Sequence, residues 1–168
     1  RNELKTFFKN PLKNKKGPKT RREIQLLQME TEERFGQYRA LVRQSFAHKK
    51  SVIFVVPTNY DLERAEKELS KGIENFVYAW NDWRKALEEK HSILFITTPP
   101  GILLGRMDIG TVIVERENSR AYRTLASPYI NFKVLIENLT KHNGQQLILG
   151  DSVLSLETLW REKSRDDG

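Results

Sequence analysis

The sequence has 168 residues, of which 38% are hydrophobic and 30% are charged, and this composition suits one globular domain with a sizeable core and a very polar surface. It contains no cysteine, which excludes disulfides and thiolate metal sites. No apolar run approaches the length needed to cross a membrane and no signal peptide is visible, so we expect a cytoplasmic protein with no membrane partner.

The net charge of +7 is concentrated at the start of the chain. Residues 1–22 hold nine Lys and Arg against one acid, whereas residues 23–168 hold 20 basic and 21 acidic residues. We therefore divide the chain into a basic arm or linker, 1–22, and a folded lobe, 23–168. Lys and Arg gain affinity for phosphates by releasing counterions, so the arm supplies the candidate nucleic-acid-binding residues, with a solvated linker as the alternative. These residues are Lys13, Lys15, Lys16, Lys19, Arg21 and Arg22.

Strand and helix patterns alternate along the lobe. Strands are expected at 23–29, 51–56, 75–79, 93–96, 111–115 and 146–149, and helices at 35–48, 61–71, 82–90, 130–141 and 155–163. The strands are too apolar to be half exposed, which favours an α/β fold with a parallel sheet between helices on both faces. The aromatic residues near 76–83 are interpreted as packing residues, with base stacking as the alternative.

One strand ends abruptly in charge. The β-branched run Thr111–Val114 is followed by Glu115, Arg116, Glu117 and Asn118. In open α/β folds, ligands bind at the carboxyl ends of the strands, so we expect the functional edge of the sheet here. Glu115 and Glu117 alternate across the strand end, which makes them a poor catalytic pair. We find no zinc-ligand spacing, dinucleotide fingerprint or nucleophile elbow, and we expect no metal site.

Five fragments, in order, resemble the first RecA-like lobe of superfamily 2 helicases, in particular the bacterial primosomal replication-restart family (primosomal protein N′, PriA). Residues 147–159 (LILGDSVLSLETL) resemble the family's LILGSATPSLETL, and residues 112–118 (VIVEREN) resemble its acidic box, IIVDEEH. Residues 51–57 resemble VLVLVPE, residues 93–103 resemble IVIGTRSAL, and residues 127–129 fall at a PRYH-like turn. The resemblance implies a three-layer P-loop NTPase fold, ATP and Mg²⁺ as cofactors, 3′-5′ helicase activity, and forked or single-stranded DNA and replication-restart proteins as partners.

The nucleotide motifs depart from that pattern. The position of the family's GVTGSGKT loop has one glycine, no lysine and three carboxylates facing the place of a polyphosphate; it reads Glu30, Thr31, Glu32, Glu33, Arg34, Phe35 and Gly36. In the acidic box, Arg116 reverses a charge and Asn118 replaces a histidine. The coupling motif, which links nucleotide state to DNA binding in the family, reads Gly150, Asp151, Ser152 and Val153 instead of GSAT.

Three altered motifs on a retained set of strands predict a helicase lobe that binds DNA in replication restart and has lost ATP hydrolysis. We therefore expect no bound ATP or Mg²⁺ and no enzymatic activity. A protein-interaction scaffold without DNA or nucleotide binding is the alternative, and an active ATPase with an unconventional loop is a third hypothesis.

Overall fold

The computed structural model describes residues 24–166, and these form a six-stranded parallel sheet between helices. The strand order is β1-β6-β5-β2-β4-β3. The strands are β1 (Ile24–Gln28), β2 (Ser51–Val55), β3 (Val77–Ala79), β4 (Leu94–Thr97), β5 (Ile109–Glu115) and β6 (Gln146–Asp151). The predicted α/β class with a parallel sheet is confirmed.

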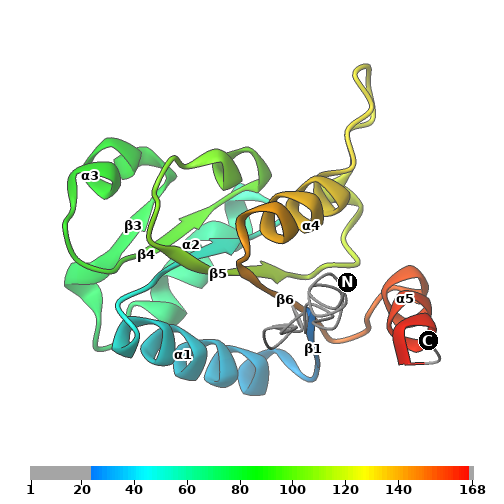
Figure 1. Cartoon of the computed structure of the whole chain (residues 1–168), viewed down its shortest axis with the longest axis horizontal. Coiled ribbons are helices and arrows are strands. Elements are labelled where there is room, and N and C mark those ends of the chain that lie inside the picture. Colours follow the sequence, from blue (N-terminus) through cyan, green and yellow to red (C-terminus); the bar gives the residue numbers. More distant parts are fainter. Residues whose placement is uncertain (1–23, 167–168) are drawn as a thin grey trace, which may run out of the picture.

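Helices cover both faces of this sheet, which gives the three layers that were expected. Figure 1 shows α1 and α4 on opposite sides of the strands. The helices are α1 (Thr31–Ala47), α2 (Asn59–Leu69), α3 (Trp83–Glu88), α4 (Phe132–Asn143) and α5 (Leu156–Asp166). Among the described residues, no helix is long and apolar enough to span a membrane.

Two apolar clusters hold the layers together because β2 and β5 are buried on both faces. Phe54 and Ile113 pack with Phe35, Tyr38 and other residues of α1 and α2. Side chains at alternate positions of the same strands point to the opposite face, where they pack with Ile136 of α4 and its neighbours. A strand buried on both faces is apolar at most successive positions, and this is why the sequence predicts β2 and β5 so clearly.

The main correction concerns the start of α1. We expected this helix to begin at residue 35, but it begins at Thr31, so residues 31–36 form helical turns. Glu32 and Glu33 lie in its first turn, where carboxylates interact favourably with the helix dipole. The predicted basic arm, with Lys13, Lys15, Lys16, Lys19, Arg21 and Arg22, lies outside the described residues.

A charged edge at the carboxyl ends of the strands

The predicted P-loop position lies where β1 passes into α1. Only Met29 and Glu30 connect the last residue of β1 to the first residue of α1. Glu30, Glu32 and Glu33 are exposed, so they do not face the centre of the edge as we expected. Helical periodicity explains the difference, since it turns Arg34 and, one turn later, Tyr38 towards the sheet. Both of these side chains are buried.

Arg34 forms a two-pronged ion pair with the first carboxylate of the acidic box. Its Nη2 lies 2.6 Å from Oε1 of Glu115, and its Nε lies 2.9 Å from Oε2. The two side chains are only 2% and 4% exposed. Removing one member of a buried pair leaves the other charge without compensation and typically costs about 3–5 kcal/mol. Loss of either partner should therefore destabilise the contact between α1 and the end of β5.

Tyr38 completes the surroundings of Glu115. Its hydroxyl donates a hydrogen bond of 2.7 Å to Oε2 of Glu115. Burial and the neighbouring carboxylate raise the pKa of Tyr38 well above its ordinary value, so the phenol remains a donor. Tyr38 reaches this position because Gly150 leaves space for it. A Cβ at residue 150 would overlap the Tyr38 hydroxyl oxygen.

The remaining contacts of Arg34 reach two further segments. Its Nη1 donates to the carbonyl of Met29 at 2.5 Å and to Oγ of Ser152 at 3.3 Å. One guanidinium thus joins the β1–α1 connection, the end of β5 and the residue that follows β6. Burial lowers the pKa of Arg34, but the hydrogen bond and charge of Glu115 outweigh it, and the net shift is upward.

Arg116 and Asn118 bind partners other than Arg34 and Tyr38. Arg116 has a left-handed backbone with φ of 52°, an uncommon conformation for a residue other than glycine. It is exposed, and its Nη1 lies 2.8 Å from Oδ1 of Asp61 in α2. The backbone N–H of Asn118 donates to Asp151 at 3.0 Å, and its amide group donates to the carbonyl of Val153 at 3.4 Å. The structure thus brings the acidic box and the predicted coupling motif into contact.

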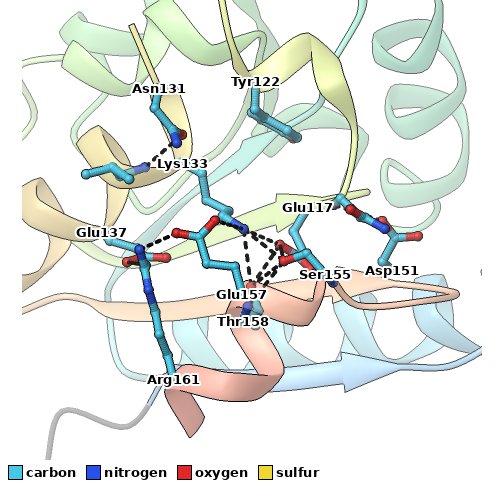
Figure 2. A network of polar contacts seen from close by, with 12 residues as sticks. Glu117, Tyr122, Asn131, Lys133, Glu137, Asp151, Ser155, Glu157, Thr158 and Arg161 are labelled. Atoms are coloured by element: carbon cyan, nitrogen blue, oxygen red, sulfur yellow. Dashed lines mark hydrogen bonds and ion pairs between the residues drawn. The ribbon is translucent and has the colours of Figure 1, made fainter.

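Glu117 is the centre of a second buried network, on the α4 and α5 side of the sheet (Figure 2). Its Oε2 lies 2.9 Å from Nζ of Lys133, and the same atom accepts hydrogen bonds from Ser155 and Thr158. Burial raises the pKa of Glu117, but the backbone N–H of Ser155 and the ammonium of Lys133 outweigh it, and the net shift is downward. As expected, Glu115 and Glu117 do not face each other as a catalytic pair would. Each is bound to its own cation.

Two small hollows accompany these networks. One, of about 160 Å³, lies next to Arg34 and Glu115, and its lining includes Asp61, Arg64, Arg116 and Asp151. The other, of about 200 Å³, lies beside Glu117 between Arg120 and Lys133. Sites for small molecules usually measure about 300–1,000 Å³, so neither hollow has the volume of a nucleotide site. Within residues 24–166, no three His, Cys, Asp or Glu side chains gather as metal ligands would.

Sequence reasoning found the box and the coupling motif but missed their partners. Tyr38 carries a weak signal, because it lies four residues after Arg34 and must share its helix face. Lys133 carries another, as a cation among the apolar residues of the first helical turn, Phe132, Val134, Leu135 and Ile136. Nothing local to the sequence joins Arg34 to Glu115, 81 residues away. Only the strand order brings them together.

The fold is similar to that of one lobe of a solved helicase. The chain superimposes on the crystal structure of the DUF1998 helicase MrfA bound to DNA and AMPPNP with a TM-score of 0.56 and 14% sequence identity. The match covers 80% of this chain and 22% of that one. At this identity it shows the fold alone, and it confirms the predicted RecA-like lobe.

The sequence itself is similar to the replication restart protein PriA of Helicobacter pylori. The two are 26% identical over 137 residues, which is 76% of this chain and 22% of PriA. The resemblance seen in the motifs is thereby confirmed. No family model matches the chain. The chain spans about a fifth of the length of each of these proteins.

Proposed function

We propose that this chain is a PriA-like helicase lobe that binds DNA in replication restart and does not hydrolyse ATP. The DNA role is supported by the similarity to a replication restart protein and by a fold shared with a helicase bound to DNA. The basic arm adds a net charge of +8, which suits contacts with phosphates.

The buried Arg34–Glu115 pair is the observation that carries the loss of hydrolysis. In the resembled family the corresponding carboxylate serves Mg²⁺, but here both Glu115 oxygens accept hydrogen bonds from the protein. A P-loop also needs several glycine N–H groups and a lysine, whereas this connection has two residues and then a helix. The residues present therefore do not fit a polyphosphate with its metal ion.

An ATPase assay with forked DNA and Mg²⁺ tests this proposal. We expect no phosphate release above background, with or without DNA. The matched control is Glu115→Gln, which should give the same background. A DNA-stimulated, Mg²⁺-dependent rate that this substitution abolishes would contradict the proposal and favour the active ATPase.

The scaffold alternative is favoured by one specific feature, the outer face of α5. Leu156, Leu159 and Trp160 are 85%, 41% and 71% exposed, whereas Thr158 on the inner face is buried. A surface helix normally turns its apolar stripe inward, so this orientation leaves an apolar face free for a protein. A scaffold should bind no forked DNA at low salt, and it should lose a protein partner when Trp160 is replaced by Gln.

A further inference from the structure

Arg34 occupies the point where three segments of the carboxyl edge meet. Its planar guanidinium carries five N–H donors in fixed directions, so this one side chain can bind several acceptors at once. The acceptors come from the β1–α1 connection, the end of β5 and the segment after β6: the carbonyl of Met29, both oxygens of Glu115 and Oγ of Ser152. The chain itself thus supplies a positive charge at the centre of this edge.

The polar network around this charge is closed. Oε2 of Glu115 accepts from both Arg34 and Tyr38, and Oε1 accepts from Arg34. Among the described residues, no buried side-chain nitrogen or oxygen lacks a hydrogen-bond partner. A diffusible cation would have to displace the guanidinium to reach Glu115. Arg34 is tethered to the chain and loses no translational freedom on pairing, so such displacement is unfavourable.

We propose that Arg34 is an internal cation that takes the place of a bound ligand and holds these three segments in one permanent arrangement. The proposal rests on the loss of nucleotide binding proposed above, and it adds a structural consequence. The β1–α1 connection, the end of β5 and the start of the coupling motif move together, whether or not ATP or Mg²⁺ is present. The lobe is therefore fixed in one state.

Chemical rescue tests whether the site accepts a cation. Arg34→Ala removes the side chain, and guanidinium is a probe that fits the vacated position. We expect the variant to melt at a lower temperature than the parent. Addition of about 20 mM guanidinium chloride, compared with the same concentration of NaCl, should raise its Tm by roughly 2–4 °C. The parent chain, with its own guanidinium in place, should show no rise.

Arg39→Ala is the matched control, because Arg39 lies on the same helix and its pair with Glu68, at 3.8 Å, is partly exposed. Its Tm should be unaffected by guanidinium. If Arg34→Ala folds and guanidinium gives no more stabilisation than NaCl, the internal-cation proposal is overturned. Parent protein that is stabilised by ATP with Mg²⁺ would instead overturn the proposed loss of nucleotide binding, so the two failures are distinguishable.

Arg34→Lys keeps the proposal testable if Arg34→Ala does not fold. Lysine retains the charge but has a single ammonium group, which cannot reproduce the planar fork. In Arg34→Lys, we expect the backbone amides near Met29, Glu115 and Ser152 all to exchange hydrogen faster than in the parent, by about tenfold or more. Exchange at parental rates in all three segments would contradict the proposal, as would faster exchange in one segment alone.

Discussion

Gly150 and Tyr38 show how closely the side chains at the carboxyl edge are fitted. The glycine follows the apolar part of β6, and the Tyr38 hydroxyl lies where a Cβ of residue 150 would be. A glycine in a strand often marks such a close approach. The sequence resemblance places Gly150 in the coupling motif, but the structure adds a packing reason for a glycine at this position.

Gly150→Ala should therefore destabilise the lobe, by roughly 1–3 kcal/mol for overpacking. Tyr38→Phe removes the nearest obstructing atom, the hydroxyl oxygen, but leaves the ring Cζ at 2.9 Å and Cδ of Arg34 at 3.0 Å. The double variant should therefore lose less stability than the sum of the two single variants, although part of the overpacking remains. Urea unfolding of all four proteins gives the coupling free energy, expected at about 0.5–3 kcal/mol. Gly105→Ala, which meets nothing within 4 Å, is the control. Additive effects of Gly150→Ala and Tyr38→Phe would argue against this contact.

The lowered pKa of Glu117 makes part of the stability depend on pH. A carboxylate whose pKa is lower in the folded state stabilises the protein fully above its unfolded pKa, about 4.3 for glutamate. This contribution is lost as the pH falls through the folded pKa. The stability difference between the parent and Glu117→Gln should thus be large at about pH 7 and shrink below about pH 4.

Urea unfolding of the parent and Glu117→Gln between about pH 3 and 7 measures this difference. Glu63→Gln is a suitable control, because Glu63 is an exposed residue of α2. Its effect should be small at every pH. A Glu117→Gln difference that stays constant down to about pH 3 would show that the carboxylate is not held charged by Lys133 and Ser155.

At the scale of elements, the order and type of the helices and strands followed from the sequence because β2, β4 and β5 each have a central run of buried apolar residues. Boundaries were less predictable. The family resemblance predicts a loop at residues 30–36. α1 nevertheless begins at Thr31, because Thr31 and its acidic neighbours make a good first helical turn. The partners of the acidic box depend on contacts between distant elements, and local patterns do not encode these.

α5 is an element held by polar contacts and turned with its apolar residues outward. Figure 1 shows it at one end of the molecule, beside β1. Lys133 of α4 lies 3.0 Å from Oγ of Ser155, the residue before α5, and 3.3 Å from Oγ1 of Thr158. Arg161 adds an ion pair to Glu137 of α4 at 2.7 Å. Because Leu156, Leu159 and Trp160 are exposed, apolar packing would do little to hold α5 in place if these polar contacts were removed.

Lys133→Met should therefore loosen α5 more than the rest of the lobe. It leaves the Glu117 charge without its cation, and amides of α5 should exchange hydrogen about tenfold faster or more, as expected for a local loss of roughly 1.4 kcal/mol. Hydrogen exchange read by mass spectrometry measures this. Lys71→Met, which removes an exposed pair with Glu68, should leave α5 unchanged. Equal acceleration in all helices would mean that Lys133 stabilises the lobe as a whole.

At the scale of the whole molecule, charge is divided between two parts. Residues 23–168 are close to neutral, and several of their exposed arginines are paired, such as Arg116 with Asp61 and Arg123 with Glu157. Residues 1–22 carry the excess of positive charge. Because phosphate contacts dominate the salt dependence of DNA binding, the two parts should differ in how they contribute to affinity.

Fluorescence anisotropy on forked DNA, at several salt concentrations, separates these contributions. Replacing all six candidate residues of the arm by Ala should reduce the slope of log affinity against log salt by roughly 0.7–0.9 for each phosphate that the arm no longer neutralises. Arg64→Ala with Arg120→Ala is a smaller change on the lobe, which removes two exposed positive charges. If affinity survives the arm variant but falls with the lobe variant, the lobe itself recognises DNA, and the replication-restart assignment gains support. Loss of all binding with the arm variant alone would make the arm a nonspecific polycation, and no binding by the parent chain would favour the protein scaffold.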